Sequence, residues 1–313
     1  MNFSRVKQAG VKQAAIKQTF VKICGYFLCF LALIGCAQKP LVTPKQTETR
    51  TIYIYNDAGT AKTCIENCKR ALLAGPHAYH IKEINAQQTI SGEWRADAAA
   101  FIMPGGADLP YCEKLNGAGN AQIKGYVEAG GTYIGFCAGA YYGSHECEFH
   151  KGDTRGYEVL GRRELSFFPG SAVGPVLAPY DYQSKSGTRI AKIKWYDEGA
   201  NEAALNEGGS QLYNVYFNGG CYFKDTDQYP HVRVLATYTN ERFNGLAAIV
   251  ECTVGLGKAL LSGVHPEFSA EDLKQEGRNL SAADQKHLAT NITPYLQDCS
   301  HKILFNLLIK RIK

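Results

Sequence analysis

The sequence predicts an α/β fold: a doubly wound, mostly parallel sheet with helices on both faces and extra strands in the second half. From residue 50 onward, apolar β-rich runs alternate with helical segments, in the order strand, crossover helix, strand. Residues 98–103 are all apolar, as in a strand buried on both faces of a parallel sheet. A chain of 313 residues can bury a large core, and we expect one domain over 50–313.

Glycine and proline mark the ends of helices in the first half of that domain. Gly75-Pro76 follows the first expected helix, and Gly130-Gly131 follows a later one. Strands are expected at 51–55, 79–84, 98–103 and 132–136, and helices at 60–73, 121–128 and 138–143.

The second half is richer in strands and shows no internal repeat. Strands are expected at 190–195, 212–217, 233–238, 247–251 and 258–264, and helices at 280–288 and 302–310. The chain has 19 tyrosines, a residue type that suits the exposed faces of strands.

The first 35 residues have the pattern of an export signal. Five bases and no acid precede an apolar run at 23–34, and its 12 residues are too few to span a bilayer comfortably. The run ends in Leu33-Ile34-Gly35-Cys36, which resembles the bacterial lipobox. We expect a signal peptide at 1–35, a lipid on Cys36 and a flexible tether at 36–49. The alternative is an uncleaved anchor or a buried helix.

This signal sets the expected location and charge of the mature protein. Ala37 after the lipidated cysteine implies sorting to the outer membrane, on the side that faces the periplasm. The five bases of the signal account for the net charge of +5, and the remaining 29 bases equal the 29 acids. A neutral domain has no electrostatic footprint for nucleic acid, so the membrane, through Cys36, is the expected partner surface.

The chain has eleven cysteines, of which Cys24 and Cys29 would leave with the signal and Cys36 would carry the lipid. An oxidising periplasm permits disulfides among the other eight. Cys64 and Cys68 lie one turn apart on an expected helix, but partners elsewhere in the chain fit equally well. The sequence leaves this pairing open.

Gly135-Phe136-Cys137-Ala138-Gly139 reads as a thiol version of the nucleophile elbow, where a strand turns sharply into a helix and exposes its central side chain. Small neighbours are required because the turn brings backbone segments close together. The helix N-terminus would favour the thiolate of Cys137. The alternative is a buried, inert cysteine.

His265-Pro266-Glu267 follows the last expected apolar strand, at the edge of the sheet where catalytic groups collect in α/β proteins. An imidazole can serve as base for the thiol, and a carboxylate two residues on can orient the ring. Pro104-Gly105-Gly106 closes the third expected strand; the N–H groups of Gly105 and Gly106, with that of Ala138, can form an oxyanion hole. The alternatives are a solvated surface turn and an ordinary strand-to-helix turn.

These motifs, in this order, resemble the signature of class I glutamine-amidotransferase-like domains. Residues 103–111, 135–141 and 216–220 also resemble the N-terminal domain of eukaryotic biotin-protein ligases. The resemblance covers most of 50–268. It implies a flavodoxin-like fold in which Cys137, His265 and Glu267 occupy the positions of a catalytic triad.

Two departures from these families bear on function. Tyr141 stands where glutaminase domains have Gln, which argues against free glutamine as the substrate, and we expect no synthase partner. Gly161-Arg162-Arg163 only weakly resembles the Gly/Arg-rich loop of biotin ligases, so we do not expect a biotin ligase.

Several further side chains are candidates for a pocket or a metal. The candidates for binding substrate are Tyr141 and three residues that each adjoin a Gly/Pro turn, Tyr111, Asn218 and Tyr222. The alternative for these three is simple packing within a loop. His145, Cys147 and His150 offer ligand atoms, but their spacing matches no closed zinc site and favours a polar face after the elbow helix. We expect no metal and no cofactor.

The sequence therefore favours a lipid-anchored envelope protein that hydrolyses or transfers the acyl group of a small amide or peptide-like substrate. Cys137 would attack the carbonyl, His265 would move the proton and Glu267 would orient the ring. The alternative is a non-catalytic ligand-binding or scaffold module that keeps the fold and the pocket.

Overall fold

The computed structural model describes residues 50–196 and 210–312. The expected signal peptide, Cys36 and the tether lie outside these residues. Within them, no helix combines the length and the apolar character needed to cross a membrane.

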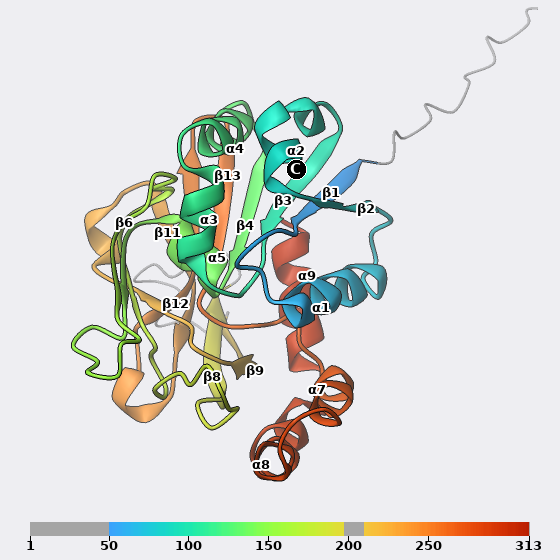
Figure 1. The fold of residues 1–313 in the computed structure, drawn as a ribbon, viewed down its shortest axis with the longest axis vertical. Coiled ribbons are helices and arrows are strands. Elements are labelled where there is room, and N and C mark those ends of the chain that lie inside the picture. Colours follow the sequence, from blue (N-terminus) through green and yellow to red (C-terminus); the bar gives the residue numbers. More distant parts are fainter. Residues whose placement is uncertain (1–49, 197–209, 313) are drawn as a thin grey trace, which may run out of the picture. The chain divides into compact units, whose positions relative to one another are not determined.

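The core of the fold is a parallel sheet in the order β2-β1-β3-β4-β13 (Figure 1). Every neighbouring pair in this order is parallel. The strands are β1 (Thr51–Tyr55), β2 (His80–Ile84), β3 (Ala98–Met103), β4 (Thr132–Phe136) and β13 (Gly257–Ser262). This arrangement confirms the predicted α/β class with a parallel core.

Helices cover both faces of the parallel core because its strands present apolar side chains on both sides. Ile52 and Ile54 pack toward one face, in a cluster with residues of α1 and α9, whereas Tyr53 and Tyr55 pack on the other, with residues of α3 and α4. All six residues of β3 are buried. The helices of the two faces are α1 (Lys62–Leu73), α2 (Ala86–Ser91), α3 (Asp108–Leu115), α4 (Ala118–Glu128), α5 (Ala138–Tyr142) and α9 (Ser300–Ile309).

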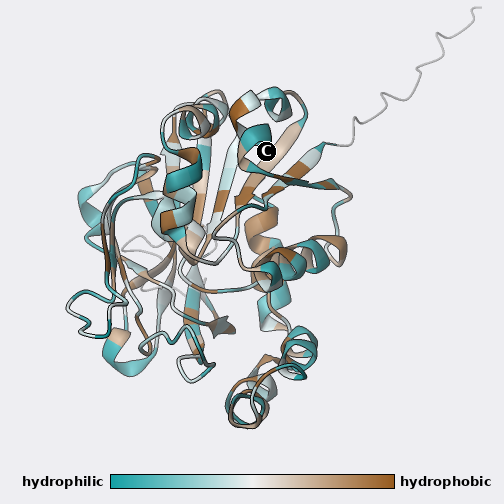
Figure 2. Cartoon of the chain, viewed as in Figure 1, coloured by the Kyte–Doolittle hydropathy of each residue, from teal (hydrophilic) through white to brown (hydrophobic). Residues whose placement is uncertain are grey.

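The second half of the chain extends this sheet mainly with antiparallel strands. β12 pairs antiparallel with β13 and with β11, and the described residues contribute 13 strands to the sheet. The added strands are β5 (Ser144–Phe149), β6 (Val159–Arg162), β7 (Phe168–Gly174), β8 (Arg189–Tyr196), β9 (Ser210–Phe217), β10 (Tyr222–Phe223), β11 (Val232–Tyr238) and β12 (Ala247–Val254). Two further helices, α7 (Ala270–Gly277) and α8 (Ala282–Asn291), follow β13. Figure 2 shows hydrophobic residues concentrated on the parallel strands and on the helix turns beside them.

The structure adds one element and corrects one sequence-based expectation. The segment that begins at Ser144 is a strand, β5, which pairs with β6 and β7. Many tyrosines are buried instead of lying on exposed strand faces. Several of their hydroxyl groups find backbone acceptors, as when Tyr133 donates to Gly139 O (2.8 Å) and Tyr238 to Cys221 O (2.7 Å).

Glycines permit a very close approach of backbone at the junction of β4 and α5. A Cβ on Gly139 would lie 2.1 Å from Met103 O at the end of β3, and one on Gly135 would lie 2.3 Å from Gly139 O. Real Cβ atoms do not approach backbone oxygens this closely, so both positions require glycine.

Gly139→Ala should therefore destabilise the protein, by about 3 kcal/mol, because a methyl group cannot enter this contact without moving β3 or α5. The matched control is Gly125→Ala in α4, where the nearest atom to a Cβ is Arg95 Nη2 at 3.5 Å. That change should leave stability unchanged or raise it by up to about 1 kcal/mol. Urea unfolding measures both, and equal effects at the two positions would contradict the steric argument.

Candidate functional site

Cys137 lies at the sharp turn between β4 and α5. Its backbone has φ 49° and ψ −107°, a conformation that non-glycine residues rarely adopt and that is found preferentially at functional sites. Its N–H donates to Ser262 O (2.9 Å) at the end of β13, which ties the turn to the neighbouring strand. Cys137 is a free thiol, as are the other seven cysteines of the described ranges.

His265 and Glu267 follow β13, the parallel neighbour of β4. His265 Nδ1 and Glu267 Oε1 are 2.7 Å apart, and both side chains are buried. The His265 N–H donates to Tyr216 O (2.9 Å), which fixes the backbone of this segment against β9. Because Nδ1 is engaged by the carboxylate, Nε2 is the ring atom left for other chemistry.

The electrostatics of His265 favour its protonated form. Burial by itself would lower the pKa of His265, but the Glu267 carboxylate and the adjacent Cys137 sulfur outweigh burial and raise that pKa to about 10. The Cys137 sulfur thus influences His265 electrostatically, while the Cys137 thiol donates its hydrogen bond to Asn218 O (3.5 Å). His265 in turn is held by Glu267 through their 2.7 Å contact.

These groups open on a cavity of about 390 Å³. Cys137, Ala138, Gly106 and His265 line it. Ala138 is the first residue of α5, so its N–H has no partner within that helix. A small molecule in this cavity would meet the sulfur, the imidazole and the turn of Gly106 together.

The Pro104-Gly105-Gly106 turn lies against Cys64, His265 and Cys137. A Cβ on Gly105 would lie 2.9 Å from Cys64 Sγ and 3.0 Å from His265 Cε1, so the turn passes between α1 and the imidazole. Gly106 has φ 153°, and a Cβ there would lie 2.0 Å from Gly59 O. Glycine at both positions lets the backbone come this close.

The four residues predicted to bind substrate separate into two pairs. Tyr141 and Asn218 line the cavity. Tyr111 does not, since it is fully buried beneath the Pro104 turn, where its hydroxyl donates to Pro104 O (3.2 Å). Tyr222 lies half-buried on β10, packed against the hydrophobic core.

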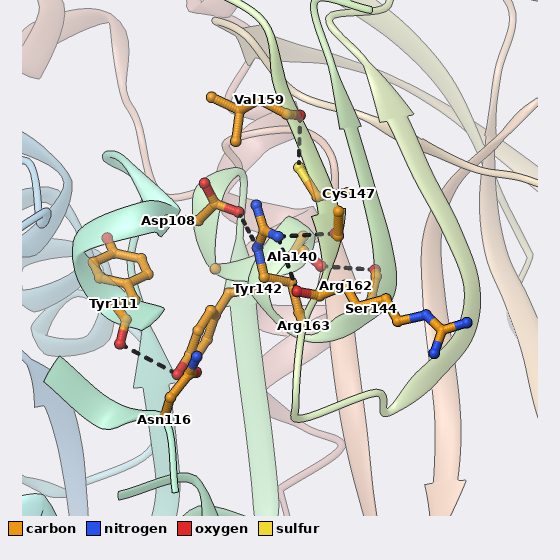
Figure 3. A network of polar contacts seen from close by, with 12 residues as sticks. Asp108, Tyr111, Asn116, Ala140, Tyr142, Ser144, Cys147, Val159, Arg162 and Arg163 are labelled. Carbon is orange, nitrogen blue, oxygen red and sulfur yellow. Dashed lines mark hydrogen bonds and ion pairs between the residues drawn. The ribbon is translucent and has the colours of Figure 1, made fainter. Parts of the chain in front are cut away.

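Arg163, the second arginine of the Gly161-Arg162-Arg163 segment, has a structural role. Arg163 is buried, and its Nε donates to Asp108 Oδ2 (2.8 Å) at the start of α3 (Figure 3). The same guanidinium donates to the carbonyls of Gly161 and Arg162 in its own segment, so the contact with Asp108 ties the end of β6 to the start of α3. This arrangement does not resemble a flexible adenylate-binding loop.

The candidate zinc ligands in β5 and directly after it do not form a cluster. Cys147 is buried and donates to Val159 O (3.6 Å), while His150 Nε2 accepts from the N–H of Tyr180 (3.0 Å). In the described part of the chain, one group of three potential metal ligands has its ligand atoms within 4.8 Å of one another. Its members are Cys64, His265 and Glu267. There the 2.7 Å contact between imidazole and carboxylate is a hydrogen bond, which occupies His265 Nδ1 and Glu267 Oε1.

Several residues of the cavity carry no motif and were not predicted from sequence. They come from α1, β5 and the segment between β7 and β8, and the cavity brings them together as Cys64, Phe149, Tyr180, Tyr182 and Lys185. The sequence offered only a weak sign that these residues reach the cavity. Tyr180 and Tyr182 are two positions apart in the chain, directly after Pro179.

Comparison with known proteins relates the chain to one family. The profile described as biotin-protein ligase, N terminal, matches residues 50–309. The chain is 36% identical over 223 residues to the biotin–protein ligase of Schizosaccharomyces pombe, which covers 70% of this chain and 34% of that protein. The chain therefore spans about a third of the length of this relative.

Two other similarities differ in strength. A Chlamydia muridarum protein described as uncharacterized is 33% identical over 263 residues, which covers 82% of this chain and 96% of that one. Among solved structures, that of PurLQS from Thermotoga maritima aligns with a TM-score of 0.48 at 13% identity, over 84% of this chain and 99% of that chain. The structural likeness is too remote to support an argument.

Replacing Glu267 by glutamine removes the carboxylate that raises the pKa of His265, while burial, which lowers it, remains. We expect the pKa of His265 in Glu267→Gln to fall from about 10, as read from an NMR titration of the ring. In the wild type the folded-state pKa lies above the unfolded value. The stabilisation from His265 is therefore complete below about pH 6.5 and is lost as the pH rises through about 10.

As the pH rises from about 6.5 to about 10, the free energy of unfolding of the wild type should accordingly fall more steeply than that of Glu267→Gln. Glu271→Gln, at an exposed carboxylate on α7, is the control and should keep the wild-type slope. Equal slopes in wild type and Glu267→Gln would contradict the coupling between His265 and Glu267.

Proposed function

The chain belongs to the biotin-protein ligase N-terminal family, and from this premise we propose that it is a lipid-anchored envelope protein with an amidotransferase-like site. In this proposal the site hydrolyses or transfers the acyl group of a small amide or peptide-like substrate. One observation supports it above the others: a cysteine in a strained turn at a helix N-terminus shares a cavity with a buried imidazole–carboxylate pair.

The proposed reaction forms and breaks one thioester. The Cys137 thiolate attacks the substrate carbonyl, and the N–H groups of Gly106 and Ala138 hold the oxyanion, with Gly105 shaping the turn. Protonated His265 gives its proton to the leaving amine, and the C–N bond breaks. Water then attacks the thioester, His265 takes a proton from it, and the acid and the thiolate leave. Glu267 keeps the ring oriented in both steps.

Glutamine is not the proposed substrate, and ligation of biotin is not the proposed activity. Tyr141 occupies the position after the elbow where glutaminase domains carry Gln, and its hydroxyl is committed to Gly219 O (3.1 Å). The ligase of Schizosaccharomyces pombe is about three times the length matched here, so its activity belongs to a larger protein.

A second candidate is a non-catalytic binding module with the same pocket. The observation in its favour is the hydrogen bond from the Cys137 thiol to Asn218 O, since a thiol that donates to a carbonyl is protonated and inert. The interaction of the same sulfur with His265 favours chemistry instead. Thiol reactivity separates the two candidates.

If His265 activates Cys137, iodoacetamide should alkylate this thiol at neutral pH faster than it alkylates free cysteine, and His265→Ala should slow the reaction by about tenfold. The physical reason is that the imidazolium beside the sulfur stabilises the thiolate. His77→Ala, at an exposed histidine outside the cavity, is the control and should react as the wild type does. Mass spectrometry of the Cys137 peptide measures the rates. A wild-type rate no faster than free cysteine, unaffected by His265→Ala, would favour the binding module.

The lipid anchor is tested separately. Cys36→Ser removes the thiol that would carry the lipid, so we expect the protein to move from the membrane fraction to the soluble periplasmic fraction. Fractionation followed by intact-mass measurement of the mature protein checks both the location and the added acyl mass. An unchanged membrane fraction with no acyl mass in the wild type would instead support an uncleaved anchor.

A further inference from the structure

One wall of the cavity is a continuous row of aromatic rings. Ring centroids of Tyr141 and Phe149 are 5.6 Å apart, those of Phe149 and Tyr180 are 6.0 Å apart, and those of Tyr180 and Tyr182 are 4.8 Å apart. All four residues line the cavity. The rings meet edge to face, which is a stable arrangement for aromatic pairs and leaves the remaining faces available to a ligand.

This aromatic wall, defined as Tyr141, Phe149, Tyr180 and Tyr182, lies directly beside the nucleophile. A Cβ on Gly219 would lie 2.8 Å from Cδ2 of Tyr180, so the Tyr180 ring rests on the backbone of Gly219. The carbonyl of the preceding residue, Asn218, accepts a hydrogen bond from the Cys137 thiol, with 3.5 Å between Sγ and O. The N–H of Tyr180 donates to His150 Nε2 (3.0 Å), which anchors the segment that carries the wall.

Three of the four acidic and basic side chains that line the cavity are already paired. Asp108 pairs with Arg163 at 2.8 Å, Lys185 with Glu276 at 2.5 Å, and His265 with Glu267 at 2.7 Å. The other carboxylate of the lining is Glu113, which is exposed to solvent. A ligand with an α-carboxylate and an α-ammonium would have to displace these pairs or lose its hydration without compensation, and both are costly.

We propose that the site accepts an uncharged acyl group with an aromatic ring, such as an arylacetyl amide or ester, and discriminates against zwitterionic amino-acid amides. This inference rests on the proposed function, whose substrate class it narrows. The aromatic wall holds the ring of the acyl group by edge and face contacts, and the carbonyl then lies between Cys137 and the turn of Gly106. Selectivity comes from the unfavourable desolvation of charge as much as from ring contacts.

Two electrophiles that alkylate thiols test the selectivity without requiring turnover. One is benzyl chloromethyl ketone. The other is an amino acid with free α-amino and α-carboxyl groups whose side chain ends in a chloromethyl ketone. Each rate at Cys137, measured by mass spectrometry, is divided by the rate of the same reagent with free cysteine. We expect the benzyl reagent to be favoured by at least about tenfold.

Tyr182→Ala should reduce this preference by about fivefold, because it removes one ring of the aromatic wall. The matched control is Tyr295→Ala, since Tyr295 lies outside the cavity lining and has a similar exposure (54% against 50% for Tyr182). Tyr295→Ala should keep the wild-type preference. A circular dichroism spectrum of each variant checks that the fold is retained.

The outcomes separate this inference from the function on which it rests. If Cys137 reacts with iodoacetamide no faster than free cysteine does, the proposed function fails and this inference fails with it. If Cys137 is reactive but favours the amino-acid reagent, or if Tyr182→Ala leaves the preference intact, the substrate class is wrong while the proposed function stands.

Discussion

The close approach between the start of α5 and the end of β3 is the constraint on which the site depends. Gly139 faces Met103 O at a separation that excludes even a methyl group, and Gly135 allows the chain to fold back on itself. The chain must therefore turn sharply after β4, and Cys137 adopts a positive φ at the apex. A strained turn of this kind holds one side chain at the edge of the sheet and leaves it little freedom to move.

The parallel order of β3, β4 and β13 brings the residues of the candidate site together. Met103 pairs with Gly135, and Phe136 pairs with Ser262, so the three strands end at the same edge of the sheet. The Pro104 turn follows β3, Cys137 follows β4 and His265 follows β13. Residues that are far apart in the sequence therefore meet at one cavity, where the low-polarity surroundings strengthen the coupling of His265 to Glu267.

The antiparallel half of the sheet has a different part in the site. It contributes Asn218 from the end of β9, Phe149 from β5 and the tyrosines that follow β7. These residues surround Cys137 with aromatic rings and a backbone carbonyl, and Asp108 and Lys185 near them are held in ion pairs. The proposed triad thus belongs to the parallel core, whereas the shape and polarity of the cavity come largely from the extension.

The sequence by itself determined the α/β class, the strands of the parallel core and the identity of the elbow and His-Pro-Glu motifs, because these features depend on local periodicity and on glycine at fixed positions. Only the tertiary structure decided which other residues reach the cavity. Tyr111 and Tyr222 were expected there and lie elsewhere, while Tyr180, Tyr182 and Cys64 line it without any motif. The reason is physical: burial, ring contacts and charge pairing depend on long-range packing, which no local pattern of residues encodes.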